Sequence, residues 1–309
     1  MDSQTLFKDG DGKELPLDAA LFTIFLCTLF GANAVAIKIS FTGIGIFTAI
    51  GLRFTIAAFA LLIWAWWKKK PLRIKKEQVR QQLLISAVFF LQMSWFYHGQ
   101  SRTTASHGTL IANVLPFVVM ILAHFILQND KITKKKFLGL ILGFCGVLLL
   151  FFDKAGSTKS SITGDLMIFL AVLHWGFNVV YIKKIISDYH ALQITIYPMF
   201  FTIPLFFISA LIWDDRMITT PIAMEVILSI LYQSLVTASF GFIMWNTLIK
   251  KYGATALHSF VFIMPISGVF FGILMLSEPL TSNLIVSILL VSAGLLVVNY
   301  RGHRGVIST

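Results

Sequence analysis

The 309-residue sequence contains little charge, because Asp, Glu, Lys and Arg make up 13% of its residues. Soluble domains carry about 25% charged residues, so this composition argues against a soluble fold. Acidic residues are the scarcer kind, at 14 against 25 Lys and Arg, and none lies in the middle of an apolar block. Exporters of lipophilic cations that exchange protons need a membrane-buried carboxylate, so we do not expect cation extrusion.

Other absences exclude further classes of protein. The two cysteines, Cys27 and Cys145, lie inside apolar blocks, which argues against a disulfide or a thiolate metal site. No HExxH, GxSxG or Walker A motif is present, so we expect no catalytic residues, no metal, no cofactor and no enzyme activity. The alternation of period two that marks a membrane barrel is also missing. The net charge of +11 lies in short clusters between apolar blocks, which indicates membrane orientation and not a nucleic-acid partner.

The sequence does contain long apolar blocks, with 57% hydrophobic residues and a mean hydropathy of +0.83. About 20 apolar residues cross the hydrocarbon layer as a helix, which satisfies every backbone group internally. The expected fold is therefore an all-α integral membrane protein of about ten transmembrane helices in the lipid bilayer. The expected spans are 19–40, 44–67, 83–100, 104–127, 137–152, 165–187, 192–213, 224–249, 254–277 and 283–300.

Lysine and arginine are distributed unequally between the loops that join these spans. Nineteen of them fall on one side, four on the other, and Lys38 and Arg53 lie within helices. Cytoplasmic loops carry the excess of positive charge, so we expect a multi-pass protein of the cell inner membrane with both termini in the cytoplasm.

The two halves of the sequence repeat each other. Residues 31–38 match residues 176–183, and residues 105–116 match residues 254–265, at nearly the same offset. Because each half has five spans, an odd number, the second half is inserted upside down. We therefore predict a tail at 1–18, one five-helix repeat at 19–152, a second, inverted repeat at 165–300 and a tail at 301–309.

These repeated residues also resemble a known family. Phe30-Gly-Ala-Asn33-Ala-Val-Ala-Ile-Lys38 is similar to the first-helix pattern of the EamA family of the drug/metabolite transporter superfamily. The segments 49–54, 104–116 and 254–265 are similar to later patterns of that family, as is Leu276-Ser-Glu278-Pro-Leu-Thr281. The resemblance covers about residues 17–300, and it implies ten helices around a central cavity with alternating access. Phe30 stands where that family has Trp, and Asn129 stands where the second half has Glu278.

Several polar side chains inside the spans are candidate substrate contacts. Arg53 requires solvation within the membrane, and a substrate carboxylate or phosphate would supply it; helix carbonyls are the alternative. Lys38 is a second candidate, with extension of its ammonium group to the membrane interface as the alternative. Amide side chains inside the spans are further candidates, with hydrogen bonding between helices as the alternative. The candidate amides are Asn33, Asn113 and Asn178.

Aromatic residues and prolines complete the candidate set. His174 is the best proton carrier by position, with packing as the alternative. Trp95, Trp175 and Trp245 lie inside spans and would line a substrate pocket, unless they pack in the core or against lipid. Pro116 and Pro265 lie at equivalent repeat positions inside spans, where each predicts a hinge or a simple kink.

Together these features predict a secondary transporter that moves a small organic metabolite by alternating access. Buried cations without buried carboxylates favour an amino acid or another carboxylated or zwitterionic compound, and export follows from family analogy alone. Import of a vitamin or nucleoside-like metabolite is the alternative, and a channel or an intramembrane enzyme is a different class. Gly139-x-x-x-Gly143 and Gly268-x-x-x-Gly272 are ridges for close helix packing that are also compatible with a homodimer.

Overall fold

The computed structural model describes residues 15–127, 132–151, 162–252, 254–258 and 260–299. Helices account for nearly all of these residues, and the described part contains no β-strand, only an isolated bridge between Ile44 and Ile218. The helices are α1 (Leu17–Ser40), α2 (Ile46–Trp67), α3 (Lys76–Arg102), α4 (Ala105–Ala112), α5 (Leu115–Ile126), α6 (Lys134–Phe151), α7 (Ile162–Ile185), the short 3₁₀ turn η2 (Ile186–Asp188), α8 (Ala191–Trp213), α9 (Met224–Leu231), the π-helix η3 (Tyr232–Gly241), α10 (Phe242–Tyr252), α11 (Ala254–His258), α12 (Ile263–Leu276) and α13 (Ser282–Asn299).

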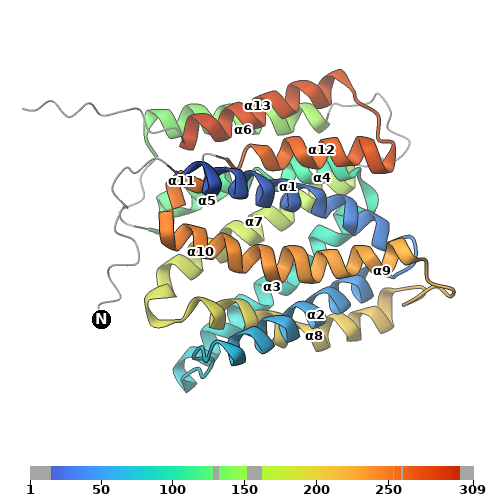
Figure 1. Cartoon of the computed structure of the whole chain (residues 1–309). Helices are drawn as coiled ribbons and strands as arrows, with labels where there is room; N and C mark the ends of the chain where they lie inside the picture. The colour runs from blue at the N-terminus through green and yellow to red at the C-terminus, as the bar shows by residue number, and fades with distance from the viewer. Residues whose placement is uncertain (1–14, 128–131, 152–161, 253, 259, 300–309) are drawn as a thin grey trace, which may run out of the picture.

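These helices form about ten rods that run side by side along one direction (Figure 1). Some rods comprise more than one helix: α4 with α5, α9 with η3 and α10, and α11 with α12. Within the described residues, eight rods are apolar and long enough to span a membrane. The other two, α3 and α6, have 27 and 18 residues and carry more charge or polarity, including three lysines at the start of α6. Their packing against α7 and α13 places both among the other rods, which confirms the all-α membrane fold.

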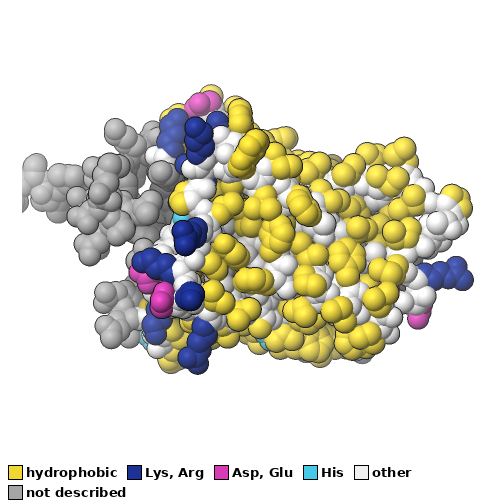
Figure 2. Space-filling view, turned by 90° about the horizontal axis from the view of Figure 1, so that it is seen from below, with side chains coloured by type: hydrophobic (Ala, Val, Ile, Leu, Met, Phe, Trp, Pro, Cys, Tyr) yellow, Lys and Arg dark blue, Asp and Glu magenta, His cyan; other side chains and the backbone are white. Residues whose placement is uncertain are grey.

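The molecular surface has an apolar middle and a basic end. Large apolar side chains such as Ile63, Leu211 and Leu289 are more than half exposed, which in a membrane means contact with lipid. Figure 2 shows this apolar surface over the middle of the molecule and most Lys and Arg gathered at one end. We call this the lysine-rich end; α2 finishes there and α3 and α6 begin there. The opposite end carries Arg102, Asp214 and Arg216.

The two halves interrupt their helices at equivalent places. Between α4 and α5 the amide of Val114 donates to the Ile111 carbonyl over 3.1 Å, and between α11 and α12 the amide of Ile263 donates to the Phe260 carbonyl over 3.0 Å. Both positions are related by the same sequence offset that relates residues 105–116 to 254–265. The duplicated break supports the two-repeat architecture that the sequence predicted.

The breaks change the interpretation of the two prolines. The sequence predicted that Pro116 and Pro265 lie in the interior of unbroken helices, but they lie in the first turns of α5 and α12. The first turn of a helix has amides without intrahelical partners, so a proline costs little there. Their hinge role stays a prediction, now at a junction between two helical segments.

Close approaches join the two halves. A Cβ atom on Gly31 of α1 would lie 2.6 Å from the Met264 carbonyl oxygen of α12, and one on Gly294 of α13 would lie 2.6 Å from the Gly139 carbonyl oxygen of α6. Only glycine allows backbones to approach this closely. Gly143, Gly268 and Gly272 also face neighbours within the chain, so both glycine ridges serve internal packing. The homodimer therefore stays a prediction without support from these ridges.

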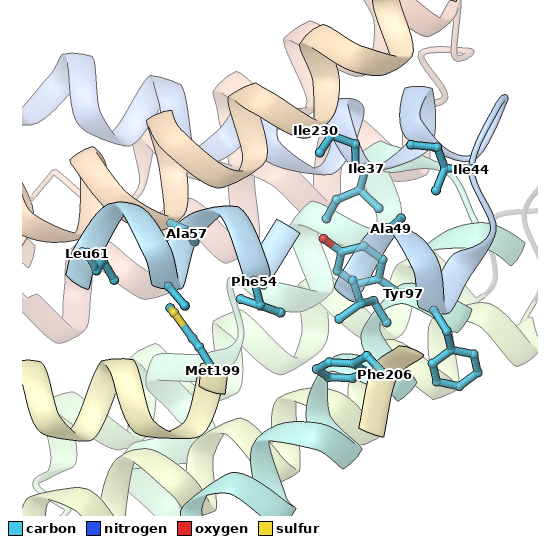
Figure 3. Close-up of a cluster of buried hydrophobic side chains, with 14 of the residues drawn as sticks. Ile37, Ile44, Ala49, Phe54, Ala57, Leu61, Tyr97, Met199, Phe206 and Ile230 are labelled. Carbon is cyan, nitrogen blue, oxygen red and sulfur yellow. The ribbon is translucent and has the colours of Figure 1, made fainter. Parts of the chain in front are cut away.

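The largest buried cluster lies where α1, α2, α3, α8 and α9 meet (Figure 3). Its members are mostly aliphatic or phenyl side chains, such as Ile37, Leu61 and Phe206. Tyr97 is fully buried within it and carries the cluster's phenolic hydroxyl. A buried phenolic hydroxyl needs a hydrogen-bond partner, and the partners of Tyr97 define the site described below.

Candidate functional site

A chain of hydrogen bonds crosses the apolar middle of the protein at Tyr97. Arg53 of α2 donates from Nη1 to the Tyr97 hydroxyl of α3 over 2.9 Å, and that hydroxyl donates to Gln233 Oε1 of η3 over 2.8 Å. Gln233 Nε2 then donates to the Ala36 carbonyl of α1 over 3.1 Å. The chain therefore joins three helices of the first half to one helix of the second half. Helix α2 starts at the opposite end of the molecule. Arg53 lies about 10 Å along the helix from that start, at a rise of about 1.5 Å per residue.

The second half contributes through the π-helix η3. Its residues Gln233, Ser234, Thr237 and Ser239 are buried, and the Thr237 hydroxyl donates to Asn33 Oδ1 over 3.1 Å. A π-helix has a wider turn, and such segments occur often at functional sites. We call Asn33, Arg53, Tyr97, Gln233 and Thr237 the central network.

The side chains of η3 follow α1 one turn at a time toward the lysine-rich end. Gln233 contacts Ala36, Thr237 contacts Asn33, and a Cβ on Gly241 would lie 2.7 Å from the Phe30 ring. One turn farther, Trp245 packs edge-on against Phe30 with ring centroids 5.9 Å apart. The structure thus connects two of the predicted site residues, Asn33 and Trp245, along one helix pair.

Arg53 has bonding capacity that the described residues do not use. Its Nε atom is buried and has no hydrogen-bond partner, and its guanidinium carbon lies 5.3 Å from the centroid of the adjacent Phe54 ring. An unpaired buried donor of a charged group costs free energy until a partner binds it. A carboxylate is the partner that matches a guanidinium best, because two parallel N–H groups donate to its two oxygens.

The other predicted polar residues lie in different surroundings. Lys38 donates from Nζ to the carbonyls of Gln100 and Thr103, so its ammonium group binds the last turn of α3. Asn113 donates to the Thr109 carbonyl of its own chain segment. Asn178 of α7 is buried, and its Oδ1 atom has no partner among the described residues.

The predicted aromatic residues are also dispersed. Trp95 of α3 and Trp175 of α7 are half-buried, and Trp245 contacts His258 at 6.1 Å between centroids in addition to Phe30. His174 lies on α7, where its Nδ1 atom is 2.8 Å from the Leu170 carbonyl one turn earlier. Of the predicted contacts, the structure therefore brings Asn33 and Arg53 into one network, while Lys38, Asn113, Asn178 and His174 lie outside it.

Sequence reasoning missed Tyr97, Gln233 and Thr237. Tyr97 looks like one more aromatic residue in an apolar span. The available signal is in η3, where glutamine, serine and threonine recur within ten residues of an otherwise apolar span. Polar residues buried in membrane helices are costly, and that cost marks them as candidates.

The expectation that no carboxylate is buried is wrong. Asp165 lies in the first turn of α7, yet it is only 1% exposed. Its Oδ2 atom is 3.0 Å from Nδ1 of His107 on α4, and its Oδ1 atom accepts a hydrogen bond from the Thr103 hydroxyl. The span end predicted from hydropathy placed Asp165 at the interface, but packing of α3 and α4 against α7 covers it.

Comparison with known proteins identifies the family. The family model described as the EamA-like transporter family matches residues 18–152 and again residues 162–300. The chain belongs to the EamA-like transporter family. It is therefore a membrane transporter by family, as its resemblance implied, and the two matches of the family model cover nearly the whole chain.

Curated relatives of this EamA-like chain are named as transporters. The uncharacterized transporter YoaV of Bacillus subtilis is 24% identical over 88% of this chain and 93% of its own length. A probable amino-acid metabolite efflux pump of Escherichia coli is 25% identical over 89% of this chain and 92% of its own length. A solved crystal structure matches with a TM-score of 0.67 at 15% identity, covering 91% of this chain and 96% of that chain, which supports the fold alone.

Proposed function

We propose that this protein is a secondary transporter that exports an amino acid or a related carboxylated metabolite by alternating access. The central network is its substrate site, and Arg53 binds the substrate carboxylate. The observation that carries this proposal is the buried Nε donor of Arg53, which has no partner among the described residues, at a point where both halves meet. A bound carboxylate supplies the missing acceptor.

The neighbours of Arg53 in the network suit the amino group of a zwitterion. Gln233 Oε1 and Asn33 Oδ1 are side-chain oxygen acceptors within the central network. An ammonium group donates three hydrogen bonds to such oxygens. Similarity to relatives named as amino-acid metabolite efflux pumps in Escherichia coli and Salmonella typhimurium supports the same substrate class.

The orientation follows from charge, and the direction of transport follows from the named relatives. Most of the lysines and arginines lie at the lysine-rich end. We therefore place this end, with both termini, on the cytoplasmic side of the cell inner membrane. The central network then opens alternately to each side as the two halves rock against each other. Export is the direction that the named efflux relatives favour.

The test is flux of paired compounds through proteoliposomes of the full-length protein. L-tyrosine with tyramine, and L-leucine with isoamylamine, differ only in the carboxylate. We expect saturable flux and counterflow of the carboxylated member of at least one pair and at least tenfold slower flux of the amine. Loss of a charged hydrogen bond costs about 1.5–3 kcal/mol, which corresponds to about 10- to 150-fold.

Two variants separate a substrate role of Arg53 from a structural one. Arg53→Gln is expected to lower kcat/KM at least tenfold, and Arg53→Lys is expected to lose less because it keeps the charge. Arg102→Gln is the matched control, because Arg102 is exposed at the end of α3. Arg53→Gln with wild-type KM and kcat contradicts the site. Flux that never saturates indicates a channel instead, and product formed without flux indicates an enzyme.

A further inference from the structure

The junction between α2 and α3 concentrates positive charge at an outer corner of the lysine-rich end (Figure 1). Seven of the 25 Lys and Arg residues of the chain fall between positions 68 and 80. We call residues 66–80 the basic junction. The general excess of positive charge in cytoplasmic loops explains the sign of this charge but not its arrangement. All seven of these side chains are exposed: Lys68, Lys69, Lys70, Arg73, Lys75, Lys76 and Arg80.

The cations of the basic junction are not neutralised by the acids around them. Two exposed carboxylates lie at this corner, Glu77 on α3 and Asp188 on η2, whose carbonyl accepts from Gln78. Among the described residues, no ion pair joins either carboxylate to one of the seven cations. Seven cations beside two carboxylates produce a positive field that attracts an anion.

Two tryptophans lie directly on the membrane side of these cations. Trp66 and Trp67 end α2, and their side chains are 81% and 70% exposed. Exposed tryptophans at the end of a transmembrane helix lie at the level of the lipid headgroups. Lys68 Nζ lies 4.2 Å from the centroid of the Trp67 ring, so the first cation of the junction lies at that same level.

Hydrogen bonds of the backbone fix the turn that presents the lysines. Lys69 has a φ of 49°, in the left-handed region, and its amide donates to the Trp66 carbonyl over 3.0 Å. The amide of Lys70 donates to the Ala65 carbonyl over 2.9 Å. These two bonds and the left-handed residue form a Schellman motif, which ends α2 and turns the chain sharply. The three lysines therefore follow the tryptophans in a defined turn.

Helix α8 of the second half holds the next part of the junction. Gln193 Nε2 donates to the Arg73 carbonyl over 2.8 Å, and the Tyr197 hydroxyl donates to the Leu72 carbonyl over 2.9 Å. Both bonds use the backbone of the junction and leave its cationic side chains exposed. A ligand that binds these side chains pays less to order them, because the backbone that carries them is already fixed.

We propose that the basic junction is a binding site for one anionic phospholipid, whose phosphate contacts the Lys and Arg side chains and whose acyl chains lie against Trp66 and Trp67. A phospholipid has its phosphate directly above hydrocarbon, in the same order in which the cations follow the tryptophans. Clusters of four to eight cations next to a transmembrane helix attract anionic lipids. Free phosphate matches the cations but not the tryptophans.

The site connects lipid binding to the central network. The junction joins α2, which carries Arg53, to α3, which carries Tyr97, and these two side chains share a hydrogen bond. A lipid bound at the junction therefore stabilises the pair of helices on which the network depends. Binding and stability can be measured without any transported substrate, so the test does not depend on the proposed function.

The test titrates purified full-length protein in detergent with phosphatidylglycerol or with phosphatidylcholine of the same acyl chains, and counts bound lipid by native mass spectrometry. We expect the wild type to bind phosphatidylglycerol at least fivefold more tightly. A cation near lipid phosphate contributes about fivefold in affinity. The triple variant Lys68→Gln, Lys69→Gln, Lys70→Gln is therefore expected to bind phosphatidylglycerol at least tenfold more weakly and to bind phosphatidylcholine unchanged.

The matched control removes three other exposed lysines, which lie at the start of α6 and the end of α7: Lys134→Gln, Lys183→Gln, Lys184→Gln. It changes the net charge equally, and its expected loss of phosphatidylglycerol affinity is below threefold. Equal losses in the two triple variants would show general attraction to a basic surface and overturn the site. The absence of any preference for phosphatidylglycerol in the wild type would overturn it as well.

Two further measurements distinguish a lipid from a free anion. Trp66→Ala with Trp67→Ala keeps all seven cations and is expected to weaken phosphatidylglycerol binding at least threefold, whereas Trp213→Ala, an exposed tryptophan at the other end, leaves it unchanged. Phosphatidylglycerol is expected to raise the thermal unfolding temperature of the wild type, and inorganic phosphate at matched ionic strength is not. Equal stabilisation by inorganic phosphate, or full binding in the double tryptophan variant, contradicts a lipid site.

Discussion

At the scale of single residues, the central network depends on one hydroxyl. The Tyr97 oxygen accepts from Arg53 and donates to Gln233, so it satisfies two polar side chains in a cluster that is otherwise apolar. Without this oxygen, a charged group and an amide lose a partner at once in a region without bulk water. Unsatisfied buried groups cost more than the hydrogen bond itself contributes.

We therefore predict that Tyr97→Phe lowers the free energy of unfolding by about 1–3 kcal/mol. The change removes one oxygen and leaves the ring packing in place. Thermal unfolding of the purified protein in detergent measures the loss. A Gln233→Leu substitution on top of Tyr97→Phe should cost less than the two single changes added together, because the second partner is no longer buried without a bond.

Tyr197→Phe is the matched control for this change. Its hydroxyl donates to the Leu72 carbonyl over 2.9 Å, in the loop after α2 at the lysine-rich end. Water replaces that bond, so the expected loss is below about 1 kcal/mol. Equal destabilisation by both substitutions would show that Tyr97 is an ordinary buried tyrosine.

At the scale of helices, two carboxylates from the second half cap helices of the first half. Glu278 accepts from the amides of Ala105 and Ser106 at the start of α4. Asp214 accepts from the amides of Phe47 and Thr48 at the start of α2, over 3.1 and 2.8 Å. Amides at a helix start lack intrahelical partners and carry partial positive charge, which a carboxylate satisfies. These caps therefore join the two halves at the end of the molecule opposite the lysine-rich end.

At the lysine-rich end, different hydrogen bonds join the two halves. Gln78 at the start of α3 donates from Nε2 to the Asp188 carbonyl over 2.6 Å, and the Tyr189 hydroxyl donates to Gln81 Oε1 over 2.6 Å. Burial raises the pKa of Tyr189, so the phenol keeps its proton and its donor role across neutral pH. The halves are therefore joined by charged caps at one end and by neutral hydrogen bonds at the other.

We predict that Glu278→Ala and Asp214→Ala each lower the free energy of unfolding by about 0.5–2 kcal/mol, as loss of a helix cap does. Hydrogen exchange should quicken at the first turn of α4 in the first variant and at the first turn of α2 in the second. Glu225→Ala is the control, because Glu225 is exposed in the first turn of α9, and its expected effect is within about 0.5 kcal/mol. Exchange that speeds up equally over the whole chain would contradict local capping.

At the scale of the whole molecule, the chain has an apolar middle between two polar ends, one of them basic. A membrane protein with this distribution places the basic end in the cytoplasm. In a cysteine-free background, we predict that Lys75→Cys and Lys184→Cys react with an impermeant maleimide only from the cytoplasmic side. Arg216→Cys is expected to react only from the other side. Labelling of Lys75→Cys and Lys184→Cys from opposite faces would contradict the topology.

Much of the fold could be predicted from the sequence because the membrane constrains each span through the residues of that span alone. A span must be apolar for about 20 residues and must satisfy its own backbone, so the spans are visible in the residues themselves. The repeat was visible because Asn33 and Asn178, and Pro116 and Pro265, recur at nearly constant offsets. The break that places each proline in a first turn was not visible, because an apolar run looks the same whether the helix continues or restarts.

The sequence by itself determined the helical membrane class, the number of rods and the duplicated halves, since each follows from the chemistry of short segments in lipid. Only the tertiary structure decided which polar side chains meet. Tyr97 and Gln233 are 136 residues apart, and His107 and Asp165 are 58 residues apart. Their contact depends on how each helix is rotated and how far it is displaced along its neighbours, which packing of the whole bundle sets.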